Sequence, residues 1–342
     1  MILAIHNGKD KKVSWNTKWI DYCENNNIPY IGVDCYSPDI IKTLKEKQVT
    51  HLMWAFSLEL PKDLIVAQSV LNAADTMGIK TCPNFNNRWH FEDKVAQKYL
   101  LESIQAPVVD SWAFFDKDKA LAFINKTELP IVAKLRRGAG SFNVVLLKTK
   151  KAARKYVNQM FDRGGVSPRQ SIRSLGKDKL AKVSNHQKTN LNIKDLYDKL
   201  VIHLKRKSLY PNELGYVYFQ EFLKDNKNDL RIAIVGGRAW GFYRGVRPND
   251  FRASGSGIID YDTPLPLDVV EESFRVTKRL KTQSLCFDYV KKNDGGYRIV
   301  EVCYGYVGSA IFNCNGYWDE NLTFHEGHYY PEELILEDFI IS

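Results

Sequence analysis

Strand-like apolar runs alternate with helix-like segments at the start of the chain, and this alternation limits the fold more than any other feature. The predicted strands and helices are, in chain order, residues 2–5, 16–25, 30–34, 38–47, 51–56 and 67–77. Strands separated by helices of this length indicate βαβ units and a parallel sheet. We therefore predict an N-terminal α/β lobe over residues 1–85.

The pattern changes after residue 85, where strand-like runs lie closer together. These runs are residues 113–115, 130–134, 143–148, 216–222, 230–235, 239–244, 286–290 and 297–302. Gly236–Gly237 and the glycines at 295 and 296 separate neighbouring runs, and glycine suits hairpin turns because it adopts positive φ without a steric penalty. We predict two α+β lobes, a central one over 86–222 and a C-terminal one over 223–342.

Positive charge is concentrated in residues 151–212. The chain has a formal net charge of +9, whereas this segment alone has 15 Lys and Arg against four Asp, so the rest of the chain is slightly negative. Such a segment would attract a polyanion, such as an acidic polysaccharide, an anionic membrane surface or nucleic acid. Nucleic acid is the weaker candidate because no zinc finger or RNA-binding motif accompanies the charge. A solvated basic insertion without a partner is the remaining alternative.

Cysteine spacing and hydropathy argue against several classes of protein. The six cysteines form no CxxC pair, which argues against a disulfide framework and a zinc site. No apolar run approaches the ~20 residues of a membrane-spanning helix. The first residues lack the pattern of a secretory signal. We therefore expect a cytoplasmic protein with no membrane span.

A lysine ends the apolar run 130–134 and precedes a glycine-rich turn. The turn contains Gly138, Gly140 and Ser141. The backbone N–H groups of such a turn can bind phosphate, and nearby cations supply countercharge. The turn matches neither the P-loop nor the dinucleotide-binding fingerprint, so on its own a simple hairpin explains it better.

Two carboxylates, Asp288 and Glu301, interrupt otherwise apolar strands. A buried carboxylate is unfavourable unless it is paired or binds a metal. Two carboxylates without a His or Cys partner suit Mg²⁺, which binds through one or two carboxylates plus substrate phosphates. Arg244, Arg247 and Arg252 precede them and could bind oxyanions or form an exposed basic edge.

In this order and spacing, these segments resemble the ATP-grasp superfamily of carboxylate–amine ligases over roughly residues 86–150 and 213–305. Segments 87–101, 301–306 and 316–319 extend the resemblance to ATP-grasp proteins of bacterial polysaccharide biosynthesis. The resemblance implies an ATP-grasp fold, in which an α/β lobe precedes two α+β lobes that clamp ATP.

The resemblance also implies roles for individual residues. Lys94 and Lys134 would contact the ATP phosphates beneath the glycine-rich turn, residues 220–223 would hold adenine through the main chain, and Asp229 would lie near the ribose or line its pocket. The implied nucleotide-binding residues are Lys94, Lys134, Gly138, Gly140, Ser141, Gln220, Glu221, Phe222, Leu223 and Asp229. The other implied site residues are Asp288 and Glu301 for Mg²⁺, and Arg244, Arg247 and Arg252 for the γ-phosphate and the acyl phosphate.

One position departs from the pattern of the superfamily. Its members usually have Glu-x-Asn on the metal-binding strand, whereas Cys303 stands at the Asn position here. A thiol is a poor ligand for a hard cation. A second ion would then rely on water, phosphate and Glu301, or Asn313 or Asn315 would fold back, or activity would be weakened.

The implied reaction is amide formation through an acyl phosphate, with ATP and Mg²⁺ as cofactors. The basic segment 151–212 adds a hypothesis on substrates, namely a uronic-acid-type sugar joined to an amino acid or amine in bacterial surface polysaccharide biosynthesis. The alternatives are an ATP-dependent kinase acting on a sugar or alcohol, a non-catalytic nucleotide-binding protein, and a nucleic-acid binder.

Overall fold

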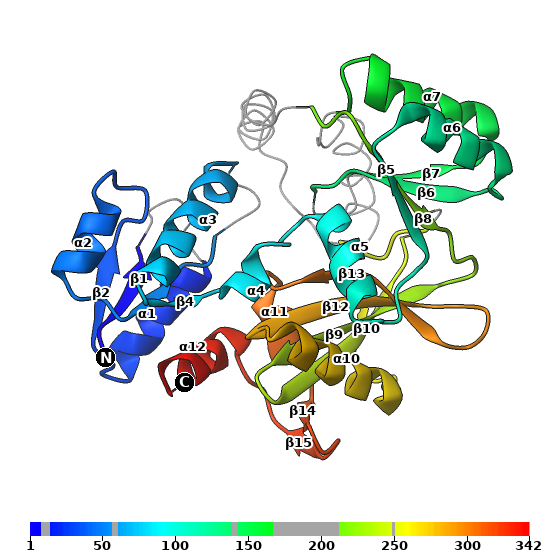
Figure 1. Cartoon of the computed structure of the whole chain (residues 1–342). Helices are drawn as coiled ribbons and strands as arrows, with labels where there is room; N and C mark the ends of the chain where they lie inside the picture. The colour runs from blue at the N-terminus through cyan, green and yellow to red at the C-terminus, as the bar shows by residue number, and fades with distance from the viewer. Residues whose placement is uncertain (8–13, 57–60, 139–142, 167–211, 248–249, 342) are drawn as a thin grey trace, which may run out of the picture. The chain divides into compact units, whose positions relative to one another are not determined.

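The structure is a computed structural model that describes residues 1–7, 14–56, 61–138, 143–166, 212–247 and 250–341 (Figure 1). The chain divides into two units. Unit 1 consists of Met1–Phe91, Ala96–Val108 and Leu223–Ser342, and unit 2 of Glu92–Val95 and Val109–Phe222. Unit 1 contains a parallel and an antiparallel sheet, and unit 2 contains a second antiparallel sheet.

The parallel sheet at the N-terminus has the strand order β2-β1-β3-β4. Its elements are β1 (Leu3–His6), α1 (Trp15–Asn25), β2 (Tyr30–Val33), α2 (Ile40–Glu46), β3 (His51–Met53), α3 (Pro61–Thr76) and β4 (Lys80–Cys82). Helix α1 begins where the Ser14 side chain accepts a hydrogen bond from the Thr17 N–H, which satisfies a donor of the first turn. The predicted alternation is confirmed. The three-residue strand β4 was not predicted, and α3 begins six residues before the predicted helix.

Both faces of the parallel sheet are buried. Successive residues of a strand point to opposite faces, and Leu3 and Ile5 belong to one apolar cluster whereas Ala4 belongs to another. The first cluster includes Trp19 of α1, and the second includes Leu71 of α3. A strand buried on both faces is apolar throughout, as β1 is, and this is typical of parallel sheets covered by helices.

The antiparallel sheet of unit 1 has the strand order β13-β12-β9-β10-β14-β15, and β11 pairs with β10. Its strands are β9 (Asn228–Val235), β10 (Arg238–Gly245), β11 (Ile259–Asp260), β12 (Ser284–Lys291), β13 (Tyr297–Cys303), β14 (Gly316–Asp319) and β15 (Phe324–Glu326). The predicted hairpins β9–β10 and β12–β13 are confirmed. Each turn contains a glycine at positive φ, +55° at Gly236 and +90° at Gly295.

Helices complete unit 1. They are α4 (Phe85–Arg88), the greater part of α5 (Lys94–Ser103), α10 (Leu267–Leu280), α11 (Gly308–Phe312) and α12 (Pro331–Ile341). Helix α10 was not predicted. Val270 and Phe274 of α10 share an apolar cluster with Ile232 of β9 and Phe287 of β12, so this helix covers one face of the antiparallel sheet. The opposite face carries the charged residues of the candidate site.

Unit 2 contains a four-stranded antiparallel sheet of order β5-β8-β6-β7. Its elements are β5 (Ser111–Phe114), α6 (Lys117–Lys126), β6 (Ile131–Lys134), β7 (Val144–Leu147), α7 (Lys150–Asp162) and β8 (Val217–Glu221). Helices α6 and α7 pack against each other, and Ile124 and Val157 join the sheet residue Phe219 in one buried cluster (Figure 1).

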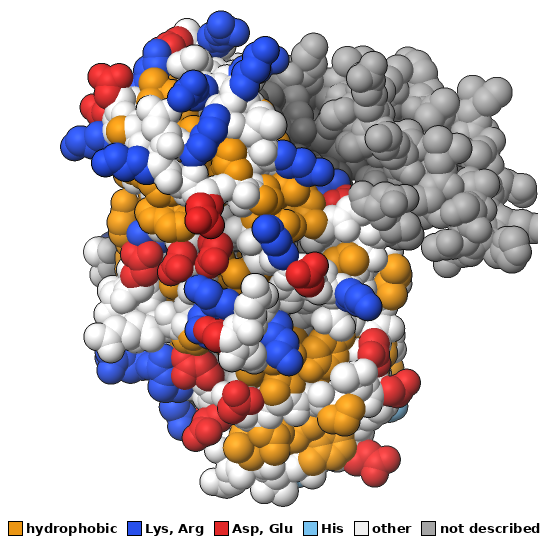
Figure 2. Space-filling model, turned by 90° about the vertical axis from the view of Figure 1, so that its right-hand side faces the viewer, with side chains coloured by type: hydrophobic (Ala, Val, Ile, Leu, Met, Phe, Trp, Pro, Cys, Tyr) orange, Lys and Arg blue, Asp and Glu red, His pale blue; other side chains and the backbone are white. Residues whose placement is uncertain are grey.

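The predicted basic segment 151–212 is described only in part, because residues 167–211 lie outside the described residues. Its first residues form α7, where Lys151, Arg154 and Lys155 are exposed. Figure 2 shows several Lys and Arg side chains gathered near the top of the view. Among the described helices, none is long and apolar enough to cross a membrane.

Candidate active site

The predicted phosphate-binding turn of unit 2 is joined to the start of α5. Lys134 is the last residue of β6, and Lys94 is the first residue of α5. The Lys94 ammonium donates a hydrogen bond to the Gly138 carbonyl (3.1 Å), and its backbone N–H donates to the Arg136 carbonyl (3.1 Å). Both lysines are buried. The structure therefore brings Lys94 to the turn that follows Lys134.

Glycine is strongly favoured at position 138. Its φ is +131°, and a Cβ added there would lie 2.0 Å from Nδ2 of Asn143. Asn143 itself donates from Nδ2 to the Arg137 carbonyl (2.9 Å) and so closes the turn. The positive φ thus strongly favours glycine, and any side chain there would also displace the Asn143 amide. The predicted residues Gly140 and Ser141 lie outside the described residues.

Glu213 and Tyr216, which the sequence analysis did not select, hold the other side of this turn. The Arg136 N–H donates to the Tyr216 hydroxyl (2.6 Å) and to Oε2 of Glu213 (3.1 Å), and the Tyr216 hydroxyl also donates to Glu213. Burial and then the neighbouring Glu213 carboxylate raise the pKa of Tyr216. The hydroxyl therefore stays protonated and keeps its donor role at neutral pH.

The predicted adenine-binding residues lie at the end of β8, where the chain leaves unit 2. Gln220 is buried, and its Nε2 donates to the Ser111 hydroxyl (3.2 Å). The Glu221 N–H donates to the Asp110 carbonyl (2.8 Å). Phe222 is the last residue of unit 2, and Leu223 begins the next segment of unit 1. The predicted linker therefore coincides with a crossing between the two units.

Four charged side chains form an alternating array on one face of the antiparallel sheet of unit 1. Arg244 of β10 donates to both oxygens of Asp229 on β9, from Nε (2.7 Å) and from Nη2 (2.6 Å). The same Nη2 lies 2.7 Å from Oδ2 of Asp288 on β12. Arg231 of β9 donates to Asp288 from Nε (2.8 Å) and from Nη2 (3.0 Å). The strand register creates the array, because it places Asp229 opposite Arg244 and Arg231 opposite Asp288. We call Asp229, Arg231, Arg244 and Asp288 the charged array.

The two carboxylates of the charged array differ in acidity. Burial alone would raise the pKa of Asp288, but Arg231 and Arg244 outweigh burial and hold this pKa at about 2. Burial and then the Asp288 carboxylate raise the pKa of Asp229. Asp288 is therefore firmly ionised at neutral pH, which is the state that a metal ligand requires.

Glu301 lies next to this array. It is the register partner of Asp288 across the β12–β13 ladder, so both side chains belong to one face of the sheet. A register shift follows directly, because Tyr289 pairs with Ile299. Cys303 lies two residues further on this face, and its thiol donates to the Gly305 carbonyl (3.0 Å). Among the described residues, no group of three or more His, Cys, Asp or Glu side chains could hold a metal ion. Two ionisable oxygen ligands still fit Mg²⁺, which takes its other ligands from phosphates and water.

The sequence matches no protein-family model, and no curated protein matches it. Solved structures do match. D-cycloserine synthetase DcsG is 13% identical over 99% of this chain and 100% of its own, with a TM-score of 0.57. The ATP-grasp ligase PsnB complexed with minimal precursor is 11% identical over 99% and 98%, with a TM-score of 0.56. D-alanine–D-alanine ligase from Bacillus anthracis is 14% identical over 89% and 85%, with a TM-score of 0.53.

The chain has the ATP-grasp fold. The predicted fold class is confirmed by these matches over nearly the whole chain. The Bacillus anthracis ligase has also been solved with ATP, and PsnB with Mg and ADP.

The remaining predicted arginines of this ATP-grasp chain lie in the loop after β10. Arg252 donates to both oxygens of Asp250, from Nε (2.9 and 3.0 Å) and from Nη2 (2.6 Å to Oδ2). Arg247 donates from Nη2 to the Ser254 carbonyl (3.0 Å), and its N–H donates to the Arg252 carbonyl (3.4 Å). The structure thus places Arg247 and Arg252 together in one loop, and Arg244 in the charged array.

Arg231 is the member of the charged array that the sequence analysis missed. It lies two residues after Asp229, so the two side chains share a face of β9. A charged residue at this spacing in an apolar strand was the available signal. Its partner Asp288 is 57 residues away, and only the strand register connects them.

Proposed function

We propose that this chain is an ATP-dependent carboxylate–amine ligase. A carboxylate oxygen of one substrate attacks the γ-phosphorus of ATP, the bond to the β-phosphate breaks, and ADP leaves. The amine of a second substrate then attacks the acyl carbon, the bond to the phosphate oxygen breaks, phosphate leaves with the proton that the amine loses, and an amide bond forms. Dividing the condensation in this way replaces one difficult step with two easier ones. The observation that carries the proposal is the charged array beside Glu301 on one face of the sheet.

Residues of unit 2, together with the adjoining Leu223, would bind the nucleotide. We assign Lys94, Lys134 and the backbone of the turn around Gly138 to the ATP phosphates, with Gly140 and Ser141 in the same turn. We assign residues 220–223 to adenine through their main chain. These assignments belong to the proposed division into an α/β lobe over 1–85, a central lobe over 86–222 and a C-terminal lobe over 223–342.

Mg²⁺ would be held by Asp288 and Glu301. The ion would neutralise phosphate charge in the transition state, as phosphoryl transfer requires. Arg244, Arg247 and Arg252 would contact the γ-phosphate and the acyl phosphate, because a guanidinium presents paired donors to oxyanions. Both oxygens of Asp229 bind Arg244, so we assign Asp229 to the wall of the nucleotide pocket.

The first test is thermal unfolding with Mg²⁺ and a non-hydrolysable ATP analogue. A ligand at 100 times its dissociation constant stabilises the folded state by about 2.7 kcal/mol. We expect Mg²⁺-dependent stabilisation of the wild type, and its loss in Glu301→Gln. Glu320→Gln is the matched control, because Glu320 is exposed and pairs with Lys278. A wild type that shows no stabilisation would contradict the proposal.

The substrate proposal is a uronic-acid-type sugar as the carboxylate donor and an amino acid or amine as the acceptor. The basic segment supports it, and its described part exposes Lys151 and Lys155 on α7. We expect uronic-acid oligosaccharide binding to weaken steeply with salt and in the double variant Lys151→Gln/Lys155→Gln. A double change of Lys42 and Lys45 on α2 to Gln is the control with equal loss of charge. If the affinity for uronic-acid oligosaccharides did not depend on salt concentration, this substrate class would be excluded.

Cys303 favours one further candidate, a nucleotide-binding protein without turnover. Its thiol stands on the strand of Glu301, where a carbonyl oxygen would serve Mg²⁺ better. Release of ADP in the presence of carboxylate and amine distinguishes this candidate from the ligase. A stable phosphorylated product would instead indicate a sugar or alcohol kinase.

A further inference from the structure

Strand β13, which carries Glu301, is the edge strand of its sheet. An edge strand leaves backbone N–H and C=O groups without a neighbouring strand. At Val302, the side chain of Gln97 takes the place of that neighbour. Nε2 of Gln97 donates to the Val302 carbonyl (2.8 Å), and the Val302 N–H donates to Oε1 of Gln97 (3.3 Å). One amide therefore satisfies both backbone groups of the residue that follows Glu301.

The Gln97 side chain is itself firmly held. It is 3% exposed, and its Nε2 donates a second hydrogen bond to the His90 carbonyl (3.2 Å). Both amide hydrogens and the amide oxygen are thereby used. A buried amide without hydrogen-bond partners is unfavourable, so moving this side chain away from its partners would cost free energy.

A second contact from the same region holds β13 on the other side of Glu301. The Ile299 N–H donates to the Pro107 carbonyl (2.7 Å), just beyond the end of α5. Between the two contacts, the ladder with β12 is irregular, since Asp288 pairs with Glu301 and Tyr289 with Ile299. An irregularity of this kind bends the strand and re-aims nearby side chains. The outer contacts therefore hold the backbone on either side of Glu301.

We propose that Gln97 is a positioning residue that fixes Glu301 for Mg²⁺. This inference rests on the proposed function, because it assumes that Glu301 binds the ion. Groups that orient a metal ligand without touching the metal typically contribute 10–100-fold to metal affinity. Gln97 would act through the β13 backbone, so its loss should change the Mg²⁺ requirement and leave metal-free nucleotide binding unchanged.

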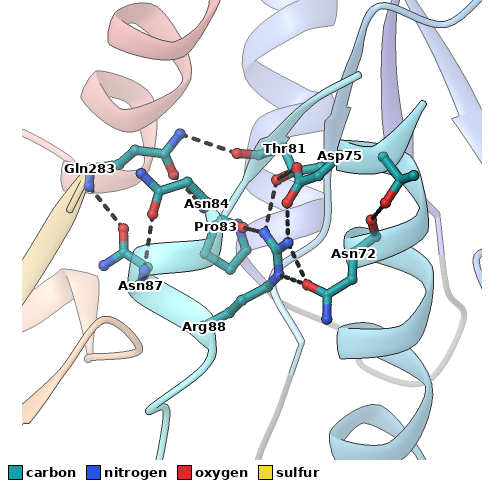
Figure 3. Close-up of polar contacts among 9 residues, drawn as sticks. Asn72, Asp75, Thr81, Pro83, Asn84, Asn87, Arg88 and Gln283 are labelled. Carbon is teal, nitrogen blue, oxygen red and sulfur yellow. Dashed lines mark hydrogen bonds and ion pairs between the residues drawn. The ribbon is translucent and has the colours of Figure 1, made fainter. Parts of the chain in front are cut away.

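The chain offers a matched control in Gln283. Its Oε1 accepts from the Asn84 N–H (2.9 Å), and its Nε2 donates to the Thr81 carbonyl (3.2 Å) (Figure 3). This amide also binds one backbone N–H and one backbone carbonyl of unit 1, but both belong to residues 81–84 and not to β13. Gln283→Leu should therefore lower stability without changing the response to metal.

The experiment measures the Mg²⁺ concentration that gives half-maximal thermal stabilisation by a non-hydrolysable ATP analogue. It compares the wild type with Gln97→Leu, Gln97→Met and Gln283→Leu. Met keeps the length of the Gln side chain and provides a second variant if Leu prevents folding. We expect this concentration to rise at least tenfold in the Gln97 variants and less than twofold in Gln283→Leu. Hydrogen exchange of the peptide 297–303 should also accelerate in the Gln97 variants without metal.

Each outcome bears on the inference. Gln97 variants whose Mg²⁺ requirement stays within twofold of the wild type would overturn it, as would an equal rise in Gln283→Leu. Loss of metal-free nucleotide binding in the Gln97 variants would also overturn it, because the effect would then not arise at Glu301. A wild type with no Mg²⁺ response would overturn the proposed function and this assignment together.

Discussion

Unit 1 contains two clusters built around buried arginines, and they are built differently. Arg88 of α4 is fully buried and donates to Asn72, Thr81, the Pro83 carbonyl and Asp75 (Figure 3). Three of these four acceptors are neutral. One positive charge thus meets one carboxylate and enough neutral oxygens to satisfy the guanidinium.

The charged array has two arginines and two aspartates, and no neutral acceptor is needed to connect them. Arg244 is shared between Asp229 and Asp288, and Arg231 also binds Asp288. Like charges lie close together here, and removing four charges even partly from water is expensive. The comparison indicates that the Arg88 cluster serves stability, and we propose that the charged array maintains charge for a ligand.

The largest expected effect is on the Arg88 cluster. Arg88→Met should lower the free energy of unfolding by about 3–5 kcal/mol, because it leaves Asp75 and several buried oxygens without their donor. Urea denaturation measures the change. Arg275→Met is the control, since Arg275 forms an exposed pair with Glu272 that is expected to contribute less than about 1 kcal/mol. A loss below 1 kcal/mol at Arg88 would remove the distinction between the two clusters.

Much of the fold was predictable because its signals are local. The βα alternation of the first 85 residues and the glycine turns of two hairpins can be read within a few residues. Helix α10 was missed although its buried residues Val270, Phe274 and Thr277 recur at helical spacing. The two- to four-residue strands β11, β14 and β15 were missed because runs of that length have no clear periodicity.

The site was predictable where a residue contradicts its own surroundings. Asp288 and Glu301 stand out because carboxylates interrupt apolar strands. Arg231 interrupts β9 in the same way, although the sequence alone does not identify its partner. Gln97 and Arg88 give no such signal, because only the tertiary fold brings them to their partners. Gln97 and Val302 are 205 residues apart, and no local pattern connects them.

Lowering the pH should destabilise the region around Arg88 while Asp288 of the charged array keeps its charge. The expected loss of stability is smaller than that of Arg88→Met and larger than that of Asp229→Asn. Burial lowers the pKa of His90, two residues from Arg88, to about 4. The unfolded chain binds this proton near pH 6.5, so stability is lost as the pH falls from about 6.5 towards 4, by about 2 kcal/mol at pH 5. Asp288, with a pKa of about 2, keeps its charge throughout this range.

Urea unfolding at pH 7 and pH 5 measures this loss. His90→Gln should flatten the pH dependence, and His328→Gln, which replaces an exposed histidine, is the matched control. If the free energy of unfolding still fell by the same amount between pH 7 and pH 5 in His90→Gln, another group would be responsible for the acid sensitivity.

The smallest expected change in stability is at Asp229. Because its folded-state pKa is raised, the ionised carboxylate at neutral pH is disfavoured by folding, and stability would increase as the pH falls and the group is protonated. Asp229→Asn imitates the protonated form, so the gain from removing the charge offsets the loss of one hydrogen bond to Arg244. We expect the free energy of unfolding to stay within about 1 kcal/mol of the wild type.

ADP formation should nevertheless fall at least tenfold in Asp229→Asn, because Arg244 loses the carboxylate that orients it. At the charged array, one substitution would then lower activity while leaving stability almost unchanged. At Arg88 we expect the reverse, a large loss of stability with an unchanged Mg²⁺ requirement in the protein that remains folded. If Asp229→Asn instead unfolded the chain as readily as Arg88→Met, the array would be a structural cluster. Its charges would then have to be explained by packing alone.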